Sequence, residues 1–217
     1  MRASNIIRRG SEKYCLYIKG QELFESMRIL KGWALGVCVA ARGGGHTTGS
    51  IHTERLALPR DLCEKLWGAP KAGDRLSYED KAKVVWYIEQ LTAVCSSLDM
   101  CIFSSVRNDP INLLDHEDYA ALFSAATGLE MTGERIMEIG ESIRTPQKVF
   151  NVIHAGFSRK DDYPPPRLME EGERTGPFKG ELLDRNKWDQ MLDEYYDLNG
   201  WDLDKLADKK RPRKIGT

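Results

Sequence analysis

The fold is decided by residues 33–48, which read WALGVCVAARGGGHTT. Small and apolar side chains fill Trp33–Arg42, a run that is too short to span a bilayer but suits a helix packed on all sides. Glycines 43–45 follow, and we expect them to end this helix because glycine adopts positive φ without strain. The pattern therefore predicts a buried helix with His46 held just beyond its end.

Helical periodicity dominates the rest of the chain. Residues 14–24 are expected to form a short extended segment with a turn at Gly20. Capping residues and apolar spacing predict further helices, which begin near Ser77 (with Asp80), Asp115, Thr132 and Asp184. Pro146 is expected to break or kink the third of these, or to begin a new helix capped by Thr145. Because strands and helices do not alternate, we predict an all-α, multihelical fold.

The spacing also predicts which side chains face the core. These are Tyr119, Leu122, Phe123 and Ala126 in one helix, then Ile136, Ile139 and Ile143 in the next, with Val149, Phe150 and Ile153 continuing that face.

Composition limits the classes of protein to which the chain can belong. Its 217 residues suffice for one sizeable core or two small ones, with seams expected near Pro110 or within residues 160–180. A net charge of −1 gives no field that would attract nucleic acid or an anionic membrane, and the basic residues 209–214 suggest only a solvated tail. We find no signal peptide or transmembrane stretch, so we expect a cytoplasmic protein.

The five cysteines are odd in number and include no Cys-x-x-Cys pair. This pattern argues against a disulfide framework and against a self-sufficient zinc or cluster site. From the residues alone, Cys101 would be a buried cysteine after a helix, and His46 would be an exposed histidine on a glycine loop.

A series of short motifs occurs in one order along nearly the whole chain. In sequence order they are Ile18–Leu23, Arg28, Gly32–Gly36, Arg42–His46, Ser96–Cys101, Ala126–Gly128, Gly140–Ile143, Phe150–Val152, Gly156–Asp162, Leu192–Tyr196 and Gly200–Asp202. In this order the chain resembles the aldehyde ferredoxin oxidoreductase family, anaerobic enzymes that carry a tungsten or molybdenum bis-molybdopterin and a [4Fe-4S] cluster.

Members of that family are much longer, with an amino-terminal pterin-binding domain and a Cys-x-x-Cys-x-x-x-Cys motif ahead of the region matched here. The resemblance therefore implies that residues 1–217 are the carboxy-terminal helical region only, as a fragment or a split gene product. It implies ferredoxin, a small aldehyde substrate and an amino-terminal half or companion subunit as partners. A homodimer is a further expectation.

The resemblance also assigns functions to individual residues. Cys101 falls where the family places its fourth cluster ligand, remote from the other three. His46 is placed beside the metal, where it would donate a hydrogen bond to the substrate carbonyl or move a proton, as its pKa near neutrality allows. Arg28 and Arg42 would pair either with pterin phosphates or with carboxylates in structural salt bridges.

Residues 96–100 precede the candidate ligand and would contact the pterin. The family has an aspartate and a glycine where this chain has Ser96 and Asp99. Ser96 can bond a pterin amino group through its hydroxyl, without the charge-assisted part of the contact, while Asp99 would be a pterin-loop residue or a solvated carboxylate. The remaining residues that would approach the heterocycle through the loop backbone are Ser97, Leu98 and Met100.

The activity implied is oxidation of an aldehyde to a carboxylate, with electrons leaving through the cluster to ferredoxin. Two alternatives remain open at this point. One is the pterin subunit of a related enzyme that reduces an aromatic thioester, as in benzoyl-CoA metabolism. The other is a non-catalytic helical module that serves only in assembly.

Overall fold

The computed structural model of the chain describes residues 6, 10–23 and 25–202. The predicted basic tail, residues 209–214, lies outside this part. The described residues form an all-α, multihelical fold with one small antiparallel hairpin, which confirms the predicted fold class. The elements are η1 (Ser11–Tyr14), β1 (Tyr17–Ile18), β2 (Gln21–Glu22), α2 (Lys31–Val39), α3 (Thr53–Leu56), α4 (Arg60–Trp67), α5 (Lys81–Ser97), η2 (Ile102–Ser104), α6 (His116–Thr127), α7 (Gly133–Ala155), η3 (Arg159–Asp162), α8 (Pro166–Glu170) and α9 (Arg185–Leu198).

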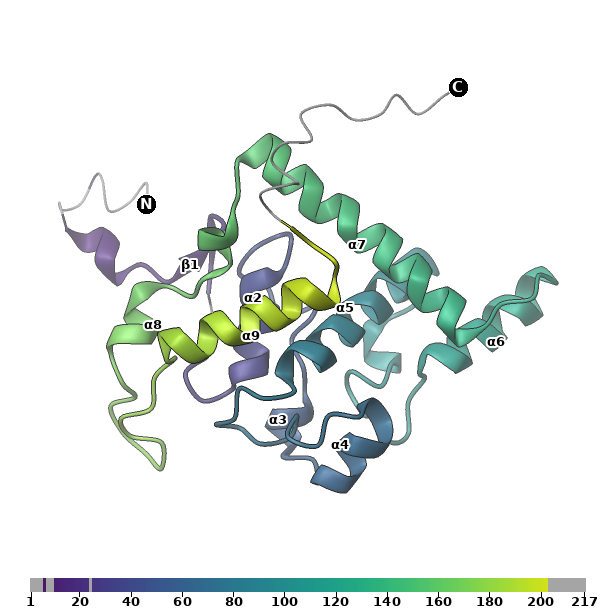
Figure 1. The fold of residues 1–217 in the computed structure, drawn as a ribbon, viewed down its shortest axis with the longest axis horizontal. Coiled ribbons are helices and arrows are strands. Elements are labelled where there is room, and N and C mark those ends of the chain that lie inside the picture. Colours follow the sequence, from purple (N-terminus) through teal and green to yellow (C-terminus); the bar gives the residue numbers. More distant parts are fainter. Residues whose placement is uncertain (1–5, 7–9, 24, 203–217) are drawn as a thin grey trace.

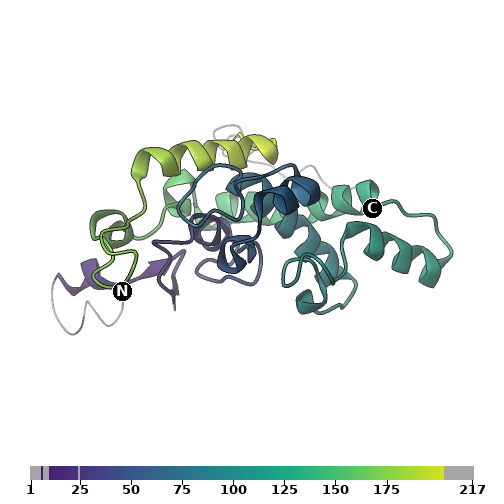
Figure 2. The ribbon, with the colours of Figure 1, turned by 90° about the horizontal axis from the view of Figure 1, so that it is seen from below.

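Helix α5 is the centre of the molecule. It packs against α2, α7 and α9, and α6 packs on α7 (Figure 1). Turned by 90°, the molecule is flat, with α9 along one long face and α6 at one end (Figure 2). The main hydrophobic core lies around α2, α5 and α9, and a smaller one lies where α5 meets α6 and α7. No helix in the described part of the chain is long and apolar enough to cross a membrane.

Helix α2 is the buried helix that the sequence predicts, since each of its residues is buried. It ends at Val39, however, and Ala40 is extended, so the expectation that the glycine run ends it is wrong. Side chains from elsewhere bind the carbonyl groups at this end instead. Lys19 Nζ donates to the carbonyl of Cys38, and Asn151 Nδ2 donates to that of Ala41 at 2.6 Å. The first bond satisfies a carbonyl of the last turn, which lacks a helical partner, and the second holds the chain just beyond the helix.

The amino-terminal end of α2 is capped by a carboxylate from another element. Residue Leu30 at the cap position offers no side-chain bond. Glu54, which is fully buried in α3, accepts hydrogen bonds from the backbone amides of Gly32 at 2.7 Å and Trp33 at 3.1 Å. A carboxylate here meets both the unsatisfied amides and the positive end of the helix dipole. Lys81 of α5, also fully buried, lies 3.1 Å from Glu54 and completes an ion pair.

The buried face of α7 is charged rather than purely apolar. Its buried residues are Gly133, Ile136, Gly140, Arg144 and Lys148. The predicted inward positions Ile139 and Ile143 are only partly buried, and Phe150 and Ile153 are exposed. The apolar pattern was misleading because two cations on this face find buried carboxylates.

Glu89 of α5 accepts one of these cations. Arg144 Nη2 lies 2.5 Å from Glu89 Oε1, and the hydroxyl of Tyr195 in α9 donates to the other carboxylate oxygen. This buried cluster joins α5, α7 and α9 and gives each buried charge a partner of opposite charge, although Nε of Arg144 has no hydrogen-bond partner.

Asp162 of η3 accepts the second cation. It pairs with Lys148 of α7 and, at 2.6 Å, with Lys19 of the hairpin turn, while Tyr196 donates to it through its hydroxyl. Asp162 is fully buried, so residues 160–180 are not simply the irregular crossing that their prolines suggest. They include η3 and α8, both packed into the molecule. A domain seam there or near Pro110 remains a prediction.

The predicted helix boundaries are mostly confirmed. Asp115 forms a capping box at the start of α6, and Gly128 ends that helix with φ 75°. Thr132 and Asp184 cap α7 and α9. Leu122 of α6 is exposed, contrary to its predicted inward position.

Two other predictions about helix boundaries need correction. The proposed box between Ser77 and Asp80 does not form, because the Asp80 carboxylate accepts from the amide of Lys71 at 2.8 Å. Helix α7 runs through Pro146, which is exposed, so the expected break and the new helix capped by Thr145 do not occur, while a kink remains a prediction.

The Glu54–Lys81 pair predicts a large loss of stability in Lys81→Met. This change leaves a buried carboxylate without its counter-charge, so the free energy of unfolding should fall by about 3–5 kcal/mol. Urea unfolding followed by circular dichroism measures it. The matched control is Lys71→Met, which removes an exposed pair with Glu79 and should cost less than about 1 kcal/mol. Equally small losses in both variants would contradict the prediction.

Candidate functional site

The glycine run lies against the β1–β2 hairpin. Gly43 and Gly44 have positive φ, 80° and 36°. A Cβ on Gly43 would come within 2.5 Å of the carbonyl oxygen of Ile18, and one on Gly44 within 2.8 Å of that of Glu22. These positions therefore need glycine for both backbone conformation and close approach. The run serves to place the following residues beside the hairpin, rather than to end α2.

A cleft of about 770 Å³ opens between the hairpin and this loop. It is lined by residues 15–17 and 20–22, and by Arg42, Gly44, Gly45, His46 and Thr47. The exposed Arg42 donates from Nη2 to Thr47 Oγ1 at 3.2 Å. The structure thus brings two of the predicted site residues, His46 and Arg42, into one cleft.

The imidazole of His46 is partly exposed in the cleft and is supported from behind. Its ring stacks on the indole of Trp33, with centroids 5.3 Å apart and planes 20° from parallel. Nδ1 lies 3.7 Å from a carboxylate oxygen of Glu25. The side chain is 29% exposed, so a ligand in the cleft can reach it. Trp33 is itself fixed by the buried α2, so the ring rests on a rigid surface.

Burial lowers the pKa of His46 below its ordinary value. The carboxylate of Glu25 opposes this shift, and the positive charges of Arg107, Arg42 and Arg55 add to it. The imidazole is therefore neutral at neutral pH. A neutral imidazole has one nitrogen that accepts a proton and one that donates, which suits proton transfer.

The sequence context of His52 suggests a surface position, but the structure does not place it there. It is buried, and its ring contacts the same indole, 5.2 Å from Trp33. Burial lowers the pKa of His52 to about 4, assisted by the charges of Arg107 and Arg55. Of the other histidines, His154 is exposed on a face of α7.

The loop that precedes Cys101 closes the end of α5. The amide of Met100 donates to the carbonyl of Cys95 at 2.9 Å, and the amide of Asp99 donates to that of Ser96 at 3.4 Å. This is a Schellman motif, whose left-handed position is filled by Asp99 with φ 53°. Aspartate tolerates this conformation better than most residues, so it can stand where the family pattern has glycine.

Cys101 is exposed, which contradicts its interpretation as a buried core cysteine. Its carbonyl accepts hydrogen bonds from the amide of Ser104 at 2.9 Å and from the Ser104 hydroxyl at 2.7 Å, so the backbone is held while the thiol remains accessible. Ser96 is exposed nearby in sequence, and Ser97 is also exposed but donates to the Ala93 carbonyl.

Leu98 and Met100 are partly buried and pack against the smaller hydrophobic core. Among the described residues, no three histidine, cysteine or acidic side chains converge to hold a metal ion. An iron–sulfur cluster takes about four thiolates. The exposed thiol of Cys101 suits the role of one such ligand. The other ligands would have to come from outside the described residues.

Arg28 lies in a different set of contacts. Its guanidinium donates to the carbonyl of Glu171 at 2.7 Å and to that of Arg167 at 3.4 Å, and it lies 3.9 Å from Glu173. These contacts tie the segment before α2 to α8. Its assignment to pterin phosphates remains a prediction, and the structure does not place it among the residues that line the cleft of His46.

Sequence reasoning missed three contributors to this site. Glu25 and Arg107 are single charged residues in irregular segments, with no spacing that marks them. Trp33 was recognised only as part of the buried helix. The adjacency of all three to His46 arises from tertiary contacts.

The low pKa of His52 predicts that acidification weakens folding. Between its ordinary value of 6.5 and about 4, the unfolded chain binds a proton at His52 that the folded chain excludes. The free energy of unfolding should therefore fall by up to about 3 kcal/mol as the pH drops across this range. Above pH 6.5 the stability of the fold should not depend on the protonation of His52. Urea melts at several pH values test this. His52→Gln should reduce the slope, whereas His154→Gln should retain it; equal slopes would refute the assignment.

The chain is similar in sequence to known proteins of one family. The family model described as aldehyde ferredoxin oxidoreductase, domains 2 and 3, matches residues 1–215. Tungsten-containing aldehyde ferredoxin oxidoreductases of Pyrococcus furiosus and Pyrococcus abyssi are each 30% identical to the chain, over 87% and 95% of its length. The one of Thermococcus kodakarensis is 26% identical over 95%.

The chain spans only 28% to 31% of the length of these relatives. The match nevertheless covers nearly all of the chain itself, including the glycine loop of His46 and the loop of Cys101. The chain therefore belongs to the aldehyde ferredoxin oxidoreductase family.

Proposed function

We propose that this chain forms the carboxy-terminal helical wall of an enzyme that oxidises an aldehyde to a carboxylate and passes the electrons to ferredoxin. The observation that carries the proposal is His46, a neutral and partly exposed imidazole that is stacked on Trp33 and faces an open cleft. Its companion would be an amino-terminal half or separate subunit with the pterin-binding domain, acting in the cytoplasm.

The cofactors would be a tungsten or molybdenum bis-molybdopterin and a [4Fe-4S] cluster, which supply the two-electron oxidation and the one-electron transfers. The residues of this chain do the rest. An aldehyde and water yield a carboxylate, two electrons and three protons, so the site needs an acceptor for protons. His46 fits this need, or donates a hydrogen bond to the aldehyde oxygen.

Arg42, exposed beside His46, offers a bidentate fork to an anionic group such as a pterin phosphate. In the other loop, Ser96 would bond the pterin through its hydroxyl, and Cys101 would supply one cluster thiolate. The other three thiolates would come from the companion. Since the described residues offer no complete metal site, the isolated chain is expected to be inactive. Before assembly with its companion it would therefore behave as a non-catalytic helical module.

The assignment of Cys101 predicts a selective effect on the cluster. In the assembled enzyme, Cys101→Ser should abolish or cripple the cluster, because it removes an accessible thiolate ligand. Cys15→Ser, Cys38→Ser and Cys63→Ser should not, and Cys38 and Cys63 are buried. Iron content and the electron paramagnetic resonance of anaerobically purified protein measure this. Stoichiometric iron in the isolated chain, or an unchanged spectrum in Cys101→Ser, would exclude the assignment.

The assignment of His46 predicts a loss of rate without a loss of stability. His46→Gln should lower turnover by the ~10²–10⁴-fold typical of a general acid or base. The melting temperature should change little, because the side chain is partly exposed. The assay is turnover of a small aldehyde with a viologen acceptor, normalised to metal content, with exposed His154→Gln as the control. Near-normal turnover per metal would remove His46 from the site.

A further inference from the structure

Arg107 is a buried cation that contacts the backbone on both sides of the cleft loop. It is only 2% exposed. Its Nη2 donates to the carbonyl of His46 at 2.8 Å, and its Nε donates to the carbonyl of Ser50 at 3.2 Å. One guanidinium therefore spans residues 46–50, the segment that carries the candidate catalytic imidazole.

The way in which this charge is buried distinguishes it from the other buried cations. Lys81, Lys148 and Arg144 each pair with a buried carboxylate, and buried Lys31, which also donates to two carbonyls, lies 3.6 Å from the partly exposed carboxylate of Glu181. No carboxylate among the described residues forms an ion pair with Arg107. Burial alone lowers the pKa of Arg107, to about 10, and it remains charged at neutral pH. Burying a guanidinium against carbonyl groups alone costs free energy. The hydrogen bonds that hold the loop offset this cost.

The loop needs such an anchor because of its composition. Glycines 43–45 and Gly49 flank His46, and glycine has the greatest backbone freedom of any residue. The ring of His46 is placed by Trp33 and Glu25, but these contacts act on the side chain alone. The bonds from Arg107 fix the backbone from which that side chain projects.

The backbone of Arg107 follows the loop of Cys101 in the sequence. The intervening residues are held by a series of short-range bonds, including Ser105 to the carbonyl of Ile102 and the amide of Val106 to that of Leu114 at 2.9 Å. The segment that begins at Cys101 is therefore continuous and hydrogen-bonded up to Arg107. It leads directly to the backbone of His46.

We propose that Arg107 is a positioning residue that holds His46 in the cleft and sets its place relative to the loop of Cys101. This inference rests on the proposed function, in which His46 acts on the substrate and Cys101 binds the cluster. The contacts themselves require no cofactor, so they can be tested on the chain alone.

Amide hydrogen exchange of the full 217-residue chain provides the first test. Arg107→Lys retains the charge but replaces the fork with a single point donor. Exchange within residues 43–50 should become about tenfold faster or more, the effect of losing roughly one hydrogen bond. Helices α5 and α7 should keep their protection. Unchanged exchange at 43–50, or a uniform rise along the chain, would overturn the proposal.

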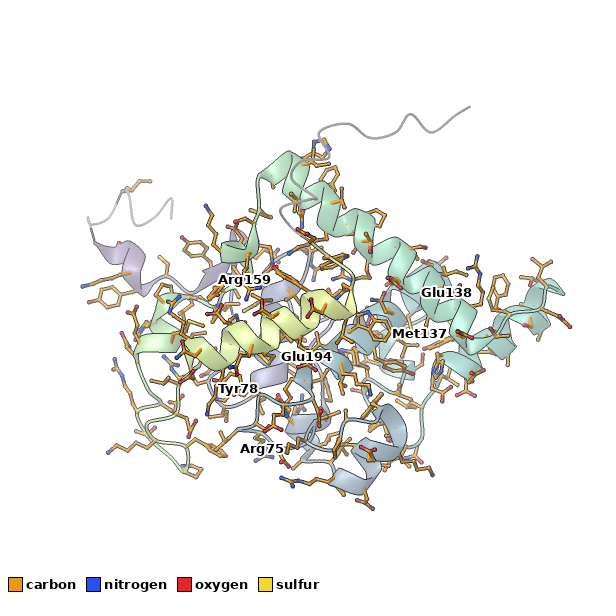
Figure 3. All side chains as sticks on the ribbon, in the orientation of Figure 1. Arg75, Tyr78, Met137, Glu138, Arg159 and Glu194 are labelled. Atoms are coloured by element: carbon orange, nitrogen blue, oxygen red, sulfur yellow. The ribbon has the colours of Figure 1, made fainter. Side chains whose placement is uncertain are left out.

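The matched control is Arg75→Lys. Arg75, labelled in Figure 3, also donates to two backbone carbonyls, those of Glu54 at 3.1 Å and Arg55 at 3.2 Å. Both carbonyls belong to α3, however, and Arg75 is exposed. Its replacement should leave exchange at residues 43–50 unchanged. An equal acceleration in both variants would show that Arg107 has no specific effect on the loop.

Nuclear magnetic resonance of the histidine rings provides a second readout. Arg107→Gln removes a charge that lowers the pKa of His46, so this pKa should rise, with Glu25, Arg42 and Arg55 still facing the ring. An unchanged His46 titration would contradict the proposal. If the loop and the titration respond as expected but the assembled enzyme does not oxidise aldehydes, the proposed function fails and the positioning by Arg107 stands.

Discussion

The buried pair of Glu54 and Lys81 is the interaction on which the rest of the structure depends. Helix α2 is buried throughout and apolar apart from Lys31, so it has no acceptor side chain of its own to cap its first turn. Glu54 accepts from its first amides, and Lys81 makes that carboxylate tolerable in the interior. One carboxylate thus joins α2, α3 and α5, and fixes the backbone of Trp33. Because His46 stacks on Trp33, the geometry of the candidate site follows from this cap.

The opposite end of α2 shows a different solution to the same physical problem. The carbonyls of Cys38, in its last turn, and of Ala41, just beyond it, are bound by Lys19 and Asn151, which come from the hairpin and from α7. Lys19 also pairs with Asp162, so the hairpin that forms one wall of the cleft is tied to the charged interior. One wall of the cleft is therefore tied down, and the glycine loop that forms the other wall is the part that needs a separate anchor.

The candidate site residues are divided between two loops. One presents a neutral imidazole and an exposed guanidinium, and the other presents a single exposed thiol at the end of α5. Neither is complete within the described residues, in keeping with a chain that spans less than a third of its relatives. Arg107 follows the loop of Cys101 in sequence and donates hydrogen bonds to the carbonyls of His46 and Ser50 in the other loop. In the proposed function, this connection would hold His46 at a fixed position relative to Cys101.

The sequence by itself determined the helical class, the buried α2, the hairpin turn and most helix caps, because these depend on local spacing and on short-range capping bonds. The ordered motifs also identified the family, with His46 and Cys101 among them. Only the tertiary structure decided where α2 ends, which face of α7 is buried and which residues support His46. Lys148 and Arg144 turn inward because Asp162 and Glu89 lie opposite them, and Arg107 reaches His46 across 61 residues of sequence. Pairing of buried charges is set by distance in space, and local periodicity carries no information about it.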